Sequence, residues 1–136
     1  TPMGVDAAYE GMELQILDHD DPIYKNLREY QQHGSVYGII AAKRVKFPAL
    51  GEWNTEEIRF EGDNVKVTVN GEVILEGNIR EACQGHNVAP DGGKKNPYTV
   101  DKKNHPGLFN KKGHIGFLGH GAGVKFRNIR ILDLSK

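Results

Sequence analysis

Side chains that can donate or accept protons are concentrated in one short stretch, GMELQILDHDD at residues 11–21. Carboxylates and imidazoles commonly serve as general acids, general bases and metal ligands, so this stretch is the first place to expect chemistry. Apolar and polar residues alternate in it, which is typical of a β-strand. We expect a strand whose polar face presents Glu13 and Gln15 and whose end carries Asp18 and further acids. An ordinary edge strand followed by an acidic turn is the alternative interpretation.

The composition limits the kinds of partner to expect. The chain has 136 residues, which is enough for a single domain over residues 1–136. Its 18 basic and 18 acidic residues cancel, so we expect neither nucleic acid nor an anionic membrane as a partner. No apolar run approaches the roughly 20 residues of a membrane-spanning helix. The single Cys83 excludes an internal disulfide, and we expect an unreactive residue in a loop or short helix.

Alternating segments elsewhere predict an all-β domain of short strands joined by glycine-rich turns. The clearest is an antiparallel meander over residues 52–76 with turns at Gly62-Asp63 and Asn70-Gly71, because Asn-Gly suits the two positive φ angles of a type I′ turn. Its expected core residues are Ile58, Phe60, Val65, Val67 and Val69.

Three further strands are expected at residues 34–43, 113–120 and 124–134, the last with a bulge near Asn128 because its alternation breaks there. Segment 77–112 has no sustained period and is predicted to be a long loop over one end of the fold. The strands and hairpins together favour a β-sandwich over a helical or parallel α/β fold.

Three pieces of the chain together resemble one known family: GMELQILDHDD at 11–21, GEWNTEEIRFEGDNVKVTVNGEVI at 51–74, and HPGLFNKKGHIGFLGHGAGVKFRNIRI at 105–131. They are similar to the 3-keto-disaccharide hydrolase domain, a member of the concanavalin A-like lectin and glucanase superfamily. The resemblance implies a jelly-roll β-sandwich with a concave face for carbohydrate, in a periplasmic or secreted bacterial protein. Such domains begin with strands before the segment matching Gly11, so we expect an incomplete jelly roll, completed by the upstream half of the same precursor.

The substrate implied by this family is an oligosaccharide or glycoside oxidised to a ketone at C3. The ketone makes the hydrogen on C2 acidic, so cleavage can begin with abstraction of that proton and continue with loss of the C1 substituent. The resemblance assigns acid and base roles to Glu13 and His120, whose pKa values are easily moved by burial or neighbours. Five residues are expected to bind substrate: Gln15, Asp18, Tyr37, Trp53 and Arg127.

Each of these assignments has a plainer alternative. His120 could be a turn histidine between glycines, Arg127 a surface residue of a strand, and Trp53 a core residue. No cofactor is assigned; a divalent metal such as calcium is an alternative, with ligands drawn from Glu13, Asp18, His86, His105 and His120, although no spacing is diagnostic.

Two other functions remain open. The run Glu13 to Asp18 is similar to the acidic strand of jelly-roll endoglucanases, which cleave unoxidised glycans, but Gln15 stands where an assisting acid is expected. A non-catalytic carbohydrate-binding module is the third possibility. A base within reach of a substrate proton would distinguish an enzyme from such a module.

Overall fold

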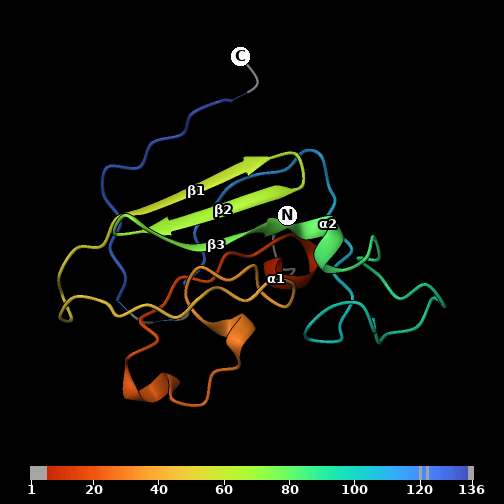
Figure 1. Cartoon of the computed structure of the whole chain (residues 1–136), viewed down its shortest axis with the longest axis horizontal. Helices are drawn as coiled ribbons and strands as arrows, with labels where there is room; N and C mark the ends of the chain where they lie inside the picture. Colours follow the sequence, from red (N-terminus) through yellow and green to blue (C-terminus); the bar gives the residue numbers. More distant parts are fainter. Residues whose placement is uncertain (1–5, 120, 122, 135–136) are drawn as a thin grey trace.

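The computed structural model describes residues 6–119, 121 and 123–134. Its named strands form one antiparallel sheet in the order β1-β2-β3, built from β1 (Glu56–Glu61), β2 (Asn64–Val69) and β3 (Glu72–Asn78) (Figure 1). The helices are short: α1 (Ala7–Glu10), the 3₁₀ turns η1 (Pro22–Tyr24) and η2 (Glu29–Gln31), and α2 (Ile79–Ala82). The predicted all-β class is therefore confirmed. None of the helices described has the length and apolar character needed to cross a membrane.

Both predicted hairpin turns are confirmed. Asn70 and Gly71 have φ angles of 50° and 83°, the positive pair that a type I′ turn requires. The Asn70 side chain joins this turn to the residues before β1, because its Oδ1 accepts a hydrogen bond from Thr55 N at 2.8 Å and its Nδ2 donates to Asn54 Oδ1 at 2.7 Å. The strand β1 begins at Glu56, which shortens the expected strand over 52–61.

The apolar core lies under β2 and β3. Val65, Val67 and Val69 are buried as predicted, with 2%, 0% and 2% of their surface exposed. The pairing register shifts after Val67, which lets the consecutive residues Ile74 and Leu75 of β3 both be buried. Phe60 packs partly against this core. The prediction for Ile58 is wrong, since it is 39% exposed: β1 is an edge strand, and the core does not extend beneath its middle.

The strand expected at 34–43 is instead a reversal of the chain. Val36 bridges Leu14 on one side and Ile40 on the other, and Gly38 between them has a φ of 74°. The hydroxyl of Ser35 accepts a hydrogen bond from Ala42 N at 2.9 Å and closes the turn. The alternation was misleading here because Gly38 readily takes a left-handed conformation that a strand excludes.

Segment 77–112 was predicted to be a long loop because it lacks periodicity, but part of it packs into the core. Ile79, Cys83 and Leu108 belong to the main core, and three polar residues of the segment are almost fully buried: Asn96, Thr99 and His105. Cys83 follows α2 directly, and burial raises the pKa of its thiol, in agreement with the expected lack of reactivity.

The strands predicted at 113–120 and 124–134 do not form in the described part of the chain. Every described residue from 111 to 134 is exposed, including Ile115, Phe117, Leu118 and Ile131. Figure 1 shows the last described residues beyond β1 and apart from the rest of the chain. Asn128 has a φ of 55°, which interrupts extended backbone where the bulge was expected. The described residues supply no second sheet, so the jelly roll as a whole stays a prediction.

Candidate functional site

The segment that contains Glu13 and Gln15 lies alongside residues 33–37 as a short, irregular antiparallel pair. Four hydrogen bonds join the two segments: Tyr37 N to Glu13 O (3.0 Å), Gln15 N to Ser35 O (3.0 Å), Gly34 N to Gln15 O (2.8 Å) and Leu17 N to His33 Nδ1 (3.3 Å). Only Leu14 and Val36 meet the definition of a bridge, so the predicted strand over 11–21 is reduced to this pairing. The pair nevertheless places Tyr37 at one end and His33 at the other.

Three tyrosines surround the Glu13 end of the pair. The ring of Tyr37 lies edge-on to Tyr9 at 6.4 Å and to Tyr30 at 5.6 Å between ring centres. Its hydroxyl accepts a hydrogen bond from Gln31 Nε2 at 3.0 Å. Burial raises the pKa of Tyr37, and the negative charge of Glu13 adds to that effect. The phenol therefore stays protonated at neutral pH and can donate a hydrogen bond to an oxygen beside Glu13.

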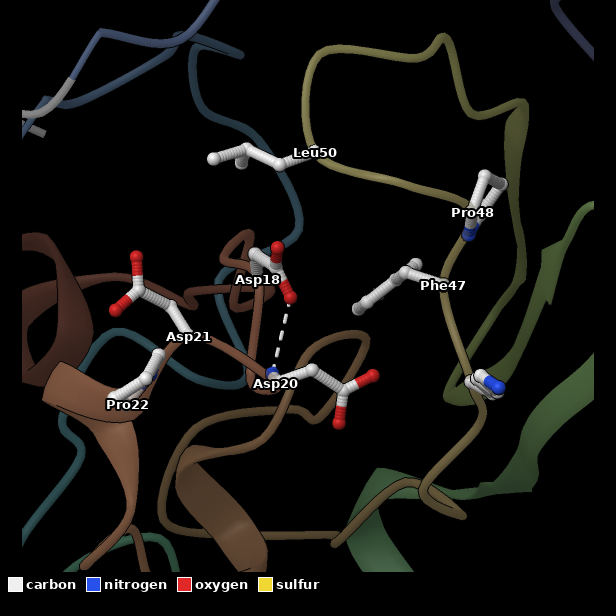
Figure 2. A pocket seen from close by; sticks show the side chains of 8 residues that line it. Asp18, Asp20, Asp21, Pro22, Phe47, Pro48 and Leu50 are labelled. Carbon is white, nitrogen blue, oxygen red and sulfur yellow. Dashed lines mark hydrogen bonds between the residues drawn. The ribbon is translucent and has the colours of Figure 1, made fainter.

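An acidic pocket of about 300 Å³ lies at the other end of the pair (Figure 2). Its lining residues are Asp18, Asp20, Asp21, Pro22, Lys46, Phe47, Pro48 and Leu50. One wall comes from the turn after Leu17, where Asp18 Oδ1 accepts a hydrogen bond from Asp20 N at 3.0 Å. The apolar wall comes from Phe47, Pro48 and Leu50. Carboxylates facing apolar side chains are a combination that suits a polar ring with hydroxyl groups.

Arg44 fixes the charge at the edge of this pocket. Its guanidinium donates to Asp20 Oδ1 at 2.7 Å and to the carbonyl oxygen of His19 at 2.8 Å. The hydrogen bond from Arg44 lowers the pKa of Asp20, which keeps this carboxylate ionised. Asp20 and Arg44 also line an adjoining hollow of about 470 Å³, together with Val45 and Lys46.

Buried polar side chains lie behind Phe47. The rings of His19 and His33 contact Phe47 at 4.8 Å and 5.0 Å between ring centres. His33 Nε2 is 3.6 Å from Glu56 Oε1, too far for a hydrogen bond. Burial and the charge of His19 lower the pKa of His33 to about 4, while burial raises the pKa of Glu56 to about 7. Both groups are therefore held largely neutral near pH 6.

Trp53 and Arg127 form a separate pair. The guanidinium carbon of Arg127 lies 3.9 Å from the centre of the Trp53 ring, a cation–π contact. Trp53 is 47% exposed, which excludes the alternative that it is a core residue. Arg127 is thus placed against an aromatic ring rather than beside the tyrosines. His120, the other acid/base candidate, lies outside the described residues.

The structure therefore divides the predicted site residues into three groups. Glu13 and Tyr37 lie together, Trp53 and Arg127 lie together, and Asp18 lines the acidic pocket; Gln15 joins the first and last along the chain. Within the described ranges, no three histidine, cysteine, aspartate or glutamate side chains are grouped closely enough to hold a metal ion. The choice of a metal stays untested.

Sequence reasoning named His105 as a possible metal ligand but did not connect it with the other residues of a second set near Tyr37. Lys103 Nζ donates to the hydroxyl of Tyr9 at 2.7 Å, and Asp101 and His105 form a buried pair with Nε2 3.1 Å from Oδ2. These residues come from α1 and from a segment without periodicity, almost a hundred positions apart. No local pattern connects them; the HPGL motif around His105 was the one visible signal.

Comparison with known proteins gives a family. A family model for the 3-keto-alpha-glucoside-1,2-lyase-like domain matches residues 3–132. A curated 3-keto-disaccharide hydrolase from Bacteroides thetaiotaomicron is 31% identical over 126 residues, which cover 88% of this chain and 42% of that protein. This chain thus spans about two fifths of the length of that relative. A crystal structure from Parabacteroides distasonis, described provisionally as a glycosyl hydrolase, has 30% identity and a TM-score of 0.48, covering 60% of this chain and 42% of that one.

Proposed function

The chain belongs to the 3-keto-alpha-glucoside-1,2-lyase-like domain family, and from this premise we propose that it takes part in cleaving glycosides oxidised to a ketone at C3. Membership alone makes it a relative of carbohydrate hydrolases. The observation that carries the finer proposal is the backbone pairing of Glu13 with Tyr37, which brings a carboxylate close enough for its charge to raise the pKa of the phenol.

The proposed reaction begins at C2. The Glu13 carboxylate takes the C2 proton, and the electron pair of the C–H bond moves toward C3, which leaves an enolate with its negative charge on the C3 oxygen. The enolate electrons then form the C1–C2 double bond and expel the C1 oxygen, which takes a proton from an acid. His120 is the proposed acid. Water adds to the double bond afterwards, and the overall result is hydrolysis.

The remaining predicted residues have proposed places around this centre. Tyr37 donates a hydrogen bond to a substrate oxygen, Gln15 orients a hydroxyl, and Asp18 receives a second sugar ring in the acidic pocket. The exposed face of Trp53 provides a stacking surface, supported from the other side by Arg127.

The test compares p-nitrophenyl 3-keto-glucoside with p-nitrophenyl glucoside, using release of p-nitrophenol by the 136-residue chain. We expect cleavage of the keto compound and little of its parent, and a loss of about two to four orders of magnitude in kcat for Glu13→Gln. Exposed Glu52→Gln is the control. Equal rates on the two compounds would replace elimination by ordinary glycoside hydrolysis, as in the endoglucanase alternative.

A carbohydrate-binding module without catalysis is the second candidate, and the exposed Trp53 ring is the observation that favours it. Binding of both compounds with cleavage of neither would support this candidate.

A periplasmic or secreted location stays part of the proposal, as does a divalent metal. We also propose that a further polypeptide, such as the upstream half of the same precursor, covers the exposed apolar residues of 113–134.

A further inference from the structure

Three distant segments of the chain meet at the buried pair Asp101 and His105. Their side chains are each 1% exposed. His105 Nδ1 donates to the carbonyl oxygen of Ala8 at 2.9 Å, while Nε2 faces the Asp101 carboxylate. Because both ring nitrogens face oxygen atoms, the ring links the Ala8 carbonyl to the Asp101 carboxylate. Gly38 O accepts hydrogen bonds from Val100 N at 3.0 Å and Asp101 N at 3.3 Å, which brings in the turn after Tyr37.

This junction determines where two further side chains lie. Ala8 precedes Tyr9, whose ring rests against the His105 ring at 5.3 Å between centres. Lys103 is bracketed by Asp101 and His105, and its backbone N donates to Asp101 Oδ1 at 3.0 Å. The junction therefore holds Tyr9 and Lys103 against each other and beside Tyr37.

The Tyr9 and Lys103 side chains form a charged, partly exposed pair. Lys103 Nζ lies 2.7 Å from the Tyr9 hydroxyl and 4.5 Å from the centre of its ring. The hydrogen bond to Tyr9 raises the pKa of Lys103, and the negative charge of Asp101 acts in the same direction. Lys103 is therefore a firmly protonated cation on the Tyr37 side of the site.

We propose that Lys103, oriented by Tyr9, is the cation that binds the developing C3 oxyanion when Glu13 removes the C2 proton, an inference that rests on the proposed function. Arg127, the one cation among the expected substrate-binding residues, lies against Trp53 instead. The surroundings of Lys103 suit an oxyanion, because Tyr37 holds its phenolic proton and the Lys103 side chain is open to solvent. Asp101 and His105 act as positioning residues.

The proposed elimination is favoured by a cation near the C3 oxygen. Proton removal transfers one negative charge from the Glu13 carboxylate to the C3 oxygen, and a cation near that oxygen lowers the energy of the enolate more than that of the ketone. Lys103 neither gains nor loses a proton in this role, so the atoms and electrons of the elimination are unchanged. Its effect falls on the proton-removal step.

The test uses the p-nitrophenyl 3-keto-glucoside assay with Lys103→Met, Lys103→Arg and Tyr9→Phe. Lys103→Met is expected to lower kcat about 10- to 100-fold with KM changed less than about threefold, because the interaction strengthens in the transition state. Lys103→Arg should keep most of the activity, and Tyr9→Phe should lie between the two. Lys94→Met, on the same loop and exposed, is the control and should match the parent chain. Circular dichroism checks that each variant is folded.

The outcomes separate this inference from the function on which it rests. If Glu13→Gln abolishes cleavage while Lys103→Met stays within twofold of the parent, Lys103 is not the oxyanion cation, although the proposed function stands. An equal loss in Lys103→Met and Lys103→Arg, with both folded, would also overturn the inference, since charge would not be what matters. No cleavage of the keto compound by the parent chain, either alone or together with the upstream half of its precursor, overturns both.

Discussion

The buried pair His33 and Glu56 leads to a sharp prediction about stability and pH. Burial alone raises the pKa of Glu56 to about 7, and burial with the charge of His19 lowers that of His33 to about 4. Neither value depends on the partner, although the two side chains are 3.6 Å apart. Removing one titrating group should therefore expose the pH dependence of the other.

The two residues have opposite effects on the free energy of unfolding. Folded Glu56 keeps its proton up to about pH 7, whereas in the unfolded chain it loses it near 4.5, so its contribution is complete below 4.5 and is lost as the pH rises to 7. Folded His33 stays neutral down to about pH 4, whereas unfolded it binds a proton below 6.5, so its contribution is lost as the pH falls from 6.5 to 4. The difference between the folded and unfolded pKa of each residue changes the free energy of unfolding by about 3 kcal/mol, at roughly 1.4 kcal/mol per pKa unit.

In the parent chain these effects cancel between about pH 4.5 and 6.5, because one proton is bound in both states. Glu56→Gln leaves His33 alone, so its stability relative to the parent should rise by about 3 kcal/mol from pH 4 to 6.5. His33→Asn keeps an acceptor for Leu17 N and leaves Glu56 alone, so its relative stability should fall by a similar amount from pH 4.5 to 7.

Urea unfolding followed by circular dichroism at half-unit steps from pH 4 to 8 measures these profiles. The double variant Glu56→Gln/His33→Asn is the control and should run parallel to the parent over the shared window. Asp101 does not interfere: burial raises its pKa, but the hydrogen bonds from His105, Lys103 and Thr99, together with the charge of His105, hold that pKa below the ordinary value. Single-variant profiles parallel to the parent between pH 4.5 and 6.5 would refute the reasoning.

Three further experiments, two sets of substitutions and one deletion, test the fold. Gly38→Ala should lower the free energy of unfolding by about 2–4 kcal/mol, because at a φ of 74° the added Cβ would lie 2.5 Å from Asp101 Oδ2. Gly51→Ala, at a φ of 91° but in open space, should lower it by only about 1 kcal/mol. Equal losses of stability in thermal melts would contradict the argument that the contact matters. Asn70→Ala should lower the free energy of unfolding by about 1–2 kcal/mol, because it removes the side-chain hydrogen bonds of Asn70 and places alanine at a positive φ. Asn70→Gly should lower it less, because glycine accepts that φ without strain. A lower melting temperature for Asn70→Gly than for Asn70→Ala would refute this reasoning. Deleting residues 111–136 should change the free energy of urea unfolding by less than about 1 kcal/mol and reduce binding of the dye ANS, because all described residues there are exposed; a large loss of stability would show that the segment packs in solution.

The hairpins could be read from the sequence because their signals are local. The turn at Asn70-Gly71 depends only on the φ angles that these two residues readily adopt. The alternation of Val65, Val67 and Val69 indicates which face of β2 is apolar. Family membership was visible for the same reason, since it rests on motifs that are continuous in the chain. These features need no knowledge of what lies opposite.

Alternation in a segment predicts which face of a strand is apolar, but it does not predict whether another layer of the protein covers that face. Residues 124–134 have the pattern of a strand and yet remain exposed, and Ile58 faces the same side as Val67 without being buried. A strand is stabilised by a neighbour that can be distant in the sequence, and the pattern of one segment does not contain that neighbour.

The candidate site shows the same division. The sequence singled out Glu13 and Tyr37 one by one, but the hydrogen-bonded pairing of their segments brings them together. Lys103 reaches Tyr9 because the buried pair Asp101 and His105 joins its loop to α1, through a contact between residues 8 and 105. Residue type and local turn chemistry are properties of a few neighbouring positions, whereas a site is made by long-range packing, and only the folded chain specifies which distant side chains share it.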